Sequence, residues 1–233
     1  MKDFGRTLVN VFTAGLRKGN PGRRVAMTVA GLVLISLSVA LSKTIGWGVD
    51  PFSVFSFSIV ELTGLSYTII FSLECLILLS VTFVLRRELL GFSTLFMLFI
   101  NGYLVDFFYG ITSRIWASPD VLTKIALLVF DVVLTCVAAS LYYASDLGVS
   151  PYDAQALTIG ALTPVPFKYA RIGTDIVCTL IGFVLLCAAK CETKYVYLNF
   201  GTLVFAFGMG PIIAWCRAHI AEPLLDGTFG KRR

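Results

Sequence analysis

Six long apolar runs constrain this chain more than any other feature of its sequence. They cover residues 25–42, 67–85, 92–108, 121–143, 172–189 and 195–215. Each run is close to the length of about 20 residues that a helix needs to cross a bilayer. No water reaches the bilayer core to bind exposed peptide groups, so a spanning segment must be a helix or part of a closed barrel. We therefore predict an all-α membrane protein with six transmembrane helices.

The composition excludes a soluble globular protein. Hydrophobic residues make up 57% of the chain and charged residues 14%, and the mean hydropathy is +0.85. Soluble domains carry about a quarter charged residues. The net charge of +5 does not indicate nucleic acid, because the basic residues gather at the ends of the apolar runs. The six cysteines are scattered without metal-ligand spacing, so we expect them to be structural, with no metal and no cofactor.

Two short stretches one hundred residues apart form an internal repeat. Residues 48–53 read Gly-Val-Asp-Pro-Phe-Ser and residues 148–153 read Gly-Val-Ser-Pro-Tyr-Asp. In each copy a polar residue, Asp50 or Ser150, precedes a proline, the pattern of a helix N-cap followed by the first helical residue. The segments that follow, 51–62 and 151–162, would be about 18 Å long, roughly half the membrane thickness. We predict two half-length helices that are re-entrant or interfacial.

The repeat continues beyond these motifs. Residues 90–95 read Leu-Gly-Phe-Ser-Thr-Leu and residues 198–203 read Leu-Asn-Phe-Gly-Thr-Leu. The offset grows from 100 to 108, which we attribute to an insertion near residues 164–172. Each copy holds three spanning helices, an odd number, so the second copy must cross the membrane in the opposite direction. The sequence predicts two inverted three-helix repeats, 25–111 and 121–216, the architecture of many secondary transporters.

The distribution of charge predicts the orientation. With the N-terminus inside, cytoplasmic segments hold 14 of the 19 lysine and arginine residues and the opposite side holds the other five. This bias places both termini in the cytoplasm of a bacterial cell, with the protein in its inner membrane. Residues 1–24 form either an amphipathic helix on the inner leaflet or an unstructured basic segment. Residues 217–233 are expected to be a basic cytoplasmic tail.

Ionisable residues inside the apolar runs are the strongest candidates for function, because burying a charge in a membrane is costly. Arg171 and Asp175 are spaced i, i+4 and can pair on one helical face. Such a pair is either structural or part of a substrate site. Glu74 lies near the middle of its run with no cation in the same helix, so it could exchange protons. Whether these three residues have a structural or a functional role stays open at this stage.

Polar residues also flank the predicted half-helices. Asp50, Ser53, Ser150 and Asp153 lie where helix N-termini favour a bound anion, although the same side chains could cap those N–H groups. Thr94 and Thr202 open the third helix of each repeat, where small residues allow close packing or a backbone-lined site. The candidate substrate- or ion-binding residues are Asp50, Pro51, Ser53, Glu74, Thr94, Ser150, Pro151, Asp153, Arg171, Asp175 and Thr202.

The sequence contains no constellation typical of an enzyme. The single histidine, His219, lies among charged residues near the C-terminus, no serine or cysteine has a base nearby in sequence, and no Gly-rich phosphate loop is present. We expect no catalytic residues. The expected partners are the lipid bilayer and a small molecule or ion, with no nucleic acid. The oligomeric state is open, a homo-oligomer included.

These motifs resemble a known family. Gly-x-x-Pro followed by an aromatic residue and Asp or Ser, with Arg-x-x-x-Asp in the second half, is similar to the YczE/YyaS/YitT family of bacterial membrane proteins. The resemblance covers residues 24–215 and rests on Gly48, Pro51, Gly148, Pro151, Asp153, Arg171 and Asp175. The chain departs from the family's Gly-x-Thr at the third helices, where it has Ser93-Thr94 and Gly201-Thr202. The resemblance implies a transporter or a membrane factor in nonribosomal peptide production.

The sequence therefore predicts a secondary transporter that moves a small polar solute or ion by alternating access, coupled to protons through Glu74 or Asp175. A non-transporting regulatory or assembly partner is the alternative, as is the substrate-binding subunit of a larger importer. Arg171 favours an anionic solute, whereas the carboxylates favour a cation or protons. The charge of the solute stays open at this stage.

Overall fold

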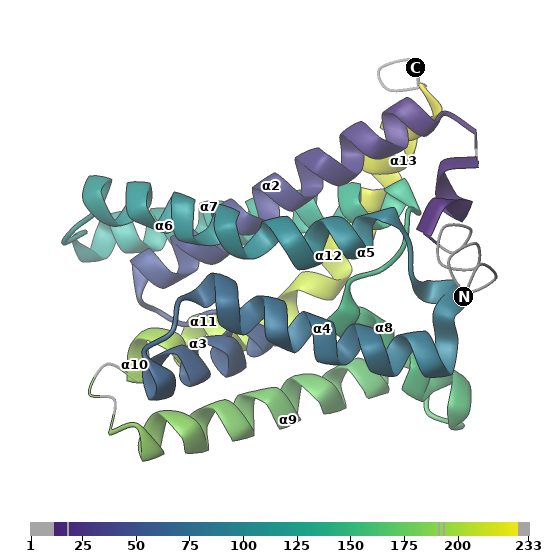
Figure 1. Ribbon diagram of the computed structural model, residues 1–233. Helices are drawn as coiled ribbons and strands as arrows, with labels where there is room; N and C mark the ends of the chain where they lie inside the picture. Colours follow the sequence, from purple (N-terminus) through teal and green to yellow (C-terminus); the bar gives the residue numbers. More distant parts are fainter. Residues whose placement is uncertain (1–11, 18, 191, 193, 228–233) are drawn as a thin grey trace.

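Six membrane-length helices make up most of the described chain. The computed structural model describes residues 12–17, 19–190, 192 and 194–227 (Figure 1). It is 85% helical. The helices long and apolar enough to cross a membrane are Pro21–Ile45, Tyr67–Leu89, Phe92–Ile115, Val121–Ser145, Tyr169–Ala188 and Tyr195–Asp226. The predicted all-α membrane protein is confirmed, and each predicted run lies in a separate helix.

Both half-length helices are present. Helix α3 (Pro51–Thr63) begins after Asp50, whose side chain accepts a hydrogen bond from the backbone N–H of Ser53 at 3.1 Å. Helix α8 (Pro151–Leu162) begins after Ser150, whose hydroxyl accepts one from the backbone N–H of Asp153 at 2.9 Å. These bonds satisfy N–H groups that the first turn of a helix leaves unpaired. The predicted caps are thus confirmed in both copies.

The helices form two layers, each drawn from both repeats (Figure 1). One layer pairs α2 (Pro21–Ile45) with α7 (Val121–Ser145) and adds α6 (Gly102–Ile115), α12 (Met209–Cys216) and α13 (Glu222–Asp226). The other holds α3, α4 (Tyr67–Arg86), α8 and α9 (Phe167–Ala188). Across the repeats, α3 packs on α9 and α4 packs on α8. The layers therefore separate the first and third helices of each repeat from the second helix and the half-helix.

The third helix of each repeat has the same interruption. The first consists of α5 (Phe92–Phe96), a π-turn η3 (Met97–Asn101) and α6. The second consists of α11 (Phe200–Leu203), a π-turn η4 (Val204–Gly208) and α12. At both starts the threonine three residues after the cap, Thr94 or Thr202, accepts a hydrogen bond from the backbone N–H of the cap residue, Gly91 or Asn199. The departures from Gly-x-Thr therefore leave the two starts with the same local geometry.

The loop before α3 is bound by the second repeat. The backbone N–H of Val49 donates to the carbonyl of Tyr197 at 3.0 Å, and the N–H of Gly201 donates to the carbonyl of Trp47 at 2.8 Å. Tyr197 belongs to the short helix α10 (Lys194–Tyr197). The start of the third helix in the second repeat thus holds the half-helix loop of the first.

The loop before α8 is bound by the first repeat in the same way. The backbone N–H of Val149 donates to the carbonyl of Leu89, in the 3₁₀ turn η2 (Arg87–Leu89), at 3.2 Å. The N–H of Ser93 donates to the carbonyl of Leu147 at 3.1 Å. Each repeat therefore supplies the hydrogen bonds that position the half-helix of the other.

The predicted position of the insertion is wrong. Helices α4 and α9 begin at residues 67 and 167, so the offset is still 100 at that point. The third helices begin after Gly91 and Asn199, an offset of 108. The extra residues thus follow α9, in the connection that contains α10. Matching the flanking motifs alone could not locate them, because the intervening sequence has diverged.

The ends of the bundle also differ from the prediction. Residues 217–226 do not form a tail, because the sixth span continues through the π-turn η5 (Arg217–Ala221) into α13. At the other end, α2 begins at Pro21, within the predicted 1–24 segment, and the 3₁₀ turn η1 (Ala14–Arg17) precedes it. Of the predicted amphipathic segment 1–24, residues 1–11 and 18 lie outside the described residues.

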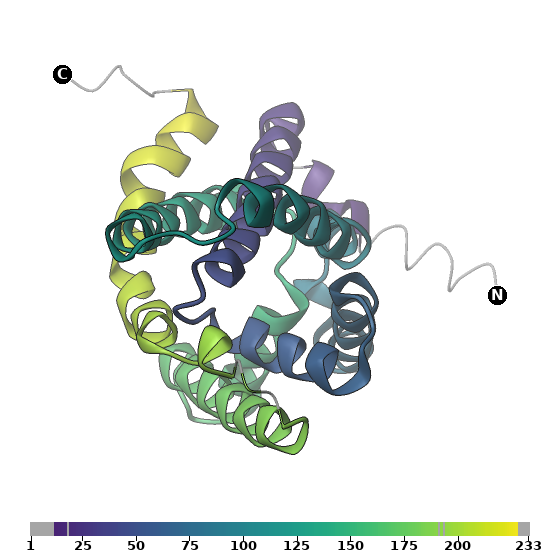
Figure 2. The ribbon, with the colours of Figure 1, turned by 90° about the vertical axis from the view of Figure 1, so that its left-hand side faces the viewer.

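The first span begins beside the end of the sixth. The Arg23 guanidinium, at the start of α2, donates to the carbonyl of Leu225 in α13 at 3.3 Å. Six spans lie between these two residues. An even number of crossings returns the chain to the side on which it started, in agreement with this contact. Figure 2 shows the bundle nearly end-on, with α2, α6 and α7 in the upper part of the view and α3, α4 and α9 in the lower part.

Candidate functional site

The N-terminal turns of the two half-helices meet inside the bundle. The rings of Phe52 in α3 and Tyr152 in α8 stack with centroids 4.6 Å apart and planes 16° from parallel. Both side chains are less than 10% exposed. In Figure 1 the labels of α3 and α8 lie toward opposite ends of the molecule, so the helices diverge from this contact. The aromatic residue of each repeated motif thus marks the meeting point of the repeats.

A charged cluster surrounds Tyr152. Arg171 in α9 forms ion pairs with Asp153, and with Asp175 at 3.3 Å between Nε and Oδ1. The guanidinium carbon lies 4.4 Å from the centroid of the Tyr152 ring. The Tyr152 hydroxyl donates to Asp175 at 2.7 Å. We call these four residues the arginine cluster, and the predicted Arg171–Asp175 pair is part of it.

Two hydroxyl groups complete the cluster around Asp153. The Tyr143 hydroxyl, from α7, donates to Asp153 Oδ2 at 2.8 Å, as does the Ser150 hydroxyl. Tyr143 belongs to one layer of helices and Asp153 to the other. This hydrogen bond therefore crosses between the layers beside the half-helix contact.

The equivalent position in the first repeat is apolar. At an offset of 100, Phe71 corresponds to Arg171, and the Phe52 and Phe71 rings meet edge to face with centroids 5.9 Å apart. Cys75 corresponds to Asp175 and is buried. The two repeats thus place side chains at equivalent positions, but only the second repeat has charged side chains there. With one guanidinium and two carboxylates, the arginine cluster carries one excess negative charge when all three groups are ionised.

Glu74, in α4, has a hydrogen-bond partner outside the arginine cluster. It is 8% exposed and accepts a hydrogen bond at Oε2 from the Ser56 hydroxyl of α3. Its other oxygen, Oε1, is buried without a hydrogen-bond partner among the described residues. A buried polar atom without a partner is rare in native proteins and calls for an explanation.

Thr94 and Thr202 form hydrogen bonds beside the loops that precede the two half-helices. The Thr94 hydroxyl accepts from the N–H of Gly91 at 3.1 Å and donates to the carbonyl of Val149 at 2.7 Å. The Thr202 hydroxyl donates to the carbonyl of Tyr197 at 3.1 Å. Thr94 thus binds the loop before α8 directly, whereas Thr202 binds the same Tyr197 carbonyl that accepts from Val49 in the loop before α3. Asp50, Pro51, Ser150 and Pro151 likewise form the starts of α3 and α8, and Ser53 is buried in the first turn of α3.

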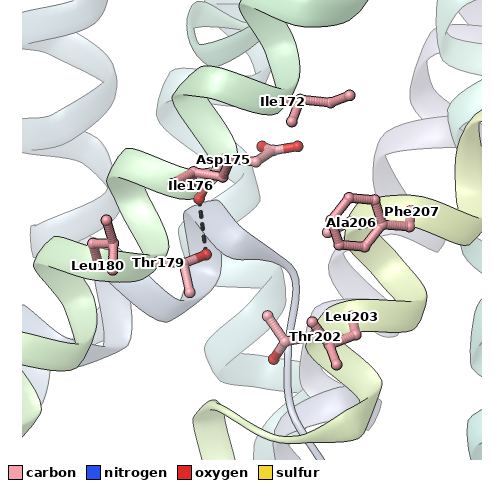
Figure 3. A pocket seen from close by; sticks show the side chains of 9 residues that line it. All are labelled: Ile172, Asp175, Ile176, Thr179, Leu180, Thr202, Leu203, Ala206 and Phe207. Carbon is pink, nitrogen blue, oxygen red and sulfur yellow. Dashed lines mark hydrogen bonds between the residues drawn. The ribbon is translucent and has the colours of Figure 1, made fainter.

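A groove of about 200 Å³ reaches the arginine cluster between α9 and the sixth span. Figure 3 shows Asp175 and Thr179 on one wall and Thr202 and Phe207 on the other. Phe207 is 65% exposed and other apolar side chains of the rim are similarly open. The groove thus opens on the outer surface of the bundle and leads to the buried Asp175.

The sequence alone did not single out two important partners. Tyr143 lies in an apolar run and Tyr152 in the repeated motif, and neither carries a charge at neutral pH. The fold brings the Tyr143 hydroxyl of α7 to Asp153 in α8, and the packing of α8 on α9 brings the Tyr152 hydroxyl to Asp175.

Asp131, an ionisable residue within the fourth apolar run, is fully buried in α7. It accepts hydrogen bonds from Ser38 and Ser42, each at 2.5 Å. The described residues contain no group of three or more metal-ligating side chains.

Comparison with known proteins identifies one relationship. A model described as a family of unknown function, DUF6198, matches residues 22–218. No curated protein and no solved structure gives a significant match. The matched range contains every residue of the arginine cluster, both half-helices and Glu74.

Proposed function

This chain belongs to DUF6198, a family of unknown function, and we propose from its own geometry that it is a secondary transporter. It moves a small polar solute or ion by alternating access across a bacterial inner membrane, with both chain ends in the cytoplasm. The observation that carries this proposal is the meeting of the two half-helix N-termini beside the arginine cluster. Half-helices that meet between inverted repeats are typical of transporter substrate sites.

The two layers supply parts that could move against each other. The layer of α3, α4, α8 and α9 is formed from equivalent elements of both repeats, as is the layer built on α2 and α7. Exchanging the conformations of the two repeats would tilt one layer against the other and open the opposite end. The Tyr143–Asp153 hydrogen bond lies between the layers, so it would respond to this motion.

Spin labels at the two ends of the bundle test the motion. In a cysteine-free background, one pair at Leu65 and Ser118 reports on one end, and a second pair at Thr163 and Leu224 reports on the other. We expect two distance populations at each end, with shifts of opposite sign when the pH or solute changes, measured by double electron–electron resonance in liposomes. A single unchanging distance at both ends would count against alternating access.

The proposed transport activity is tested with the purified protein reconstituted into liposomes. Proteoliposomes with an imposed pH gradient should accumulate or release at least one member of a panel of carboxylates, phosphates and amines, and protein-free liposomes provide the control. If no solute moves and a second membrane protein purifies in a stable complex with this chain, the function as a non-transporting partner is favoured instead.

Glu74 is the carboxylate best suited to carry a coupling proton. Asp175 is paired with Arg171 and bound by Tyr152, which stabilises its ionised form. Glu74 has one hydroxyl donor and one unpaired oxygen, and no cation lies within 4.0 Å of it among the described residues. An ionised carboxylate in such surroundings is costly, so the protonated form is favoured.

Dicyclohexylcarbodiimide, which reacts with protonated carboxyl groups in apolar surroundings, is therefore expected to label Glu74 and spare Asp175. The extent of labelling should fall as the pH rises, because the ionised form does not react. Peptide mass spectrometry locates the modified residue, and the Glu74→Gln variant is the control. Modification of Asp175 with Glu74 intact would contradict the assignment.

A further inference from the structure

A second cavity lies at the end of the bundle away from the chain termini. Its volume is about 550 Å³, within the range of small-molecule sites. It is bounded by the end of α2, the end of α6, the connection to α7, and α10. The polar side chains that line it are Lys43, Thr44, Tyr109, Ser118, Lys124 and Tyr197. We call it the lysine cavity.

The two ammonium groups of the lysine cavity lie against aromatic rings. Lys43 Nζ lies 4.2 Å from the centroid of the Tyr109 ring and 4.6 Å from that of Phe57. Lys124 Nζ lies 5.9 Å from the centroid of Trp47. Among the described residues, no carboxylate oxygen lies within 4.0 Å of either nitrogen. Aromatic faces attract these cations but do not neutralise them.

The nearest carboxylates have other partners. The carboxylates of Glu61 and Asp106 attract the Lys43 ammonium group electrostatically, but neither residue lines the cavity. Glu61 accepts a hydrogen bond from the Tyr197 hydroxyl at 2.5 Å. Asp106 accepts bonds from the backbone N–H and the hydroxyl of Thr68, at 3.1 and 2.6 Å. The Thr44 hydroxyl is also occupied, because it donates to the carbonyl of Ala40 at 2.9 Å. The described part of the cavity wall therefore presents two ammonium groups and the hydroxyls of Tyr109 and Ser118, without a carboxylate.

From this arrangement we infer that the lysine cavity binds a small oxyanion, a solute that carries a carboxylate or a phosphate group. Ammonium and hydroxyl groups donate to such oxygens in charge-assisted hydrogen bonds. A cationic solute would meet like charge with no carboxylate among the described lining residues to balance it. The proposed orientation also places these lysines on the non-cytoplasmic side of the membrane, where basic residues are depleted. A function in binding an anion would explain why both lysines line the cavity there.

The lysine cavity extends the proposed function by assigning it a substrate class. Its role as the entrance for the transported solute rests on the proposed transporter, whereas binding of an oxyanion does not require transport. A binding measurement thus tests the cavity even if no solute is carried across the membrane.

Trp47 provides a reporter for this test. With Trp116→Phe and Trp215→Phe, Trp47 is the single tryptophan in the full-length chain, beside Lys124. Sodium phosphate and sodium succinate are titrated separately into the detergent-solubilised protein at constant ionic strength set with sodium chloride. We expect a saturable fluorescence change with at least one oxyanion and none with tetramethylammonium chloride. Saturation by phosphate alone or by succinate alone supports the site and identifies the preferred group.

Variants then assign the binding to the lysines. Lys43→Gln and Lys124→Gln should each weaken binding by about tenfold, because each removes one charge-assisted contact. Lys43→Arg should retain most of the affinity, and Arg114→Gln, an exposed basic residue outside the cavity lining, should leave it unchanged. The inference is overturned if folded protein shows no saturable response to either oxyanion, or if both glutamine variants bind as tightly as the parent.

Discussion

Replacing Gly91 with alanine is expected to destabilise the protein by about 3 kcal/mol, a large loss for one methyl group. A Cβ atom at this position would lie 2.0 Å from the carbonyl oxygen of Leu147 and 2.8 Å from Cα of Gly148. Both contacts are with backbone, which cannot rotate away as a side chain can. The loop before α8 would have to move, and with it the half-helix start beside the arginine cluster.

Matched glycines make this test specific. Gly110 and Gly210 are helical residues at which an added methyl group would meet no heavy atom of a neighbouring element within 4 Å, so alanine there should leave stability unchanged or raise it slightly. The thermal unfolding midpoint and the yield of monodisperse protein in detergent measure the difference. Equal midpoints for Gly91→Ala and Gly110→Ala would show that the loop does not need the close approach seen in this structure.

Replacing Arg171 with glutamine is the second change with a large expected effect. It removes the cation between Asp153 and Asp175, which are 6% and 8% exposed. Removing one partner of a buried ion pair typically costs about 3–5 kcal/mol, because the remaining charge is left uncompensated. The Arg171 side chain is 31% exposed, so we expect a loss near the lower end of this range. We therefore expect a marked fall in the unfolding midpoint at neutral pH, and partial recovery at acidic pH as the carboxylates are protonated.

A second substitution separates charge from packing. Adding Asp153→Asn to Arg171→Gln should restore part of the lost stability, because only one carboxylate then remains. Arg86→Gln is the matched control. Its side chain is 29% exposed, close to the 31% of Arg171, but its partner Glu88 is 59% exposed, so this ion pair should contribute less than about 1 kcal/mol. If the double variant is no more stable than Arg171→Gln alone, the loss comes from packing rather than from unpaired charge.

The parts of this fold that depend on residues adjacent in the chain could be predicted from the sequence. Asp50 and Ser150 were identified as caps because a cap and its proline are adjacent in the chain, and the spans follow from continuous apolar length. Tyr143 cannot be identified in this way, since its hydrogen bond to Asp153 depends on where the turn after α7 places the start of α8. The position of the insertion was missed for a similar reason, because it follows from where α9 ends.

The exchange of loop contacts between the repeats has a consequence for the origin of this architecture. A single repeat, alone in a membrane, would lack the carbonyl and N–H partners that orient its own short helix. A one-repeat ancestor would therefore have needed a second copy in the opposite orientation to complete these contacts. Fusion of the two genes would have made that antiparallel pairing permanent and allowed the copies to differ, one with Phe71 and Cys75 where the other has Arg171 and Asp175.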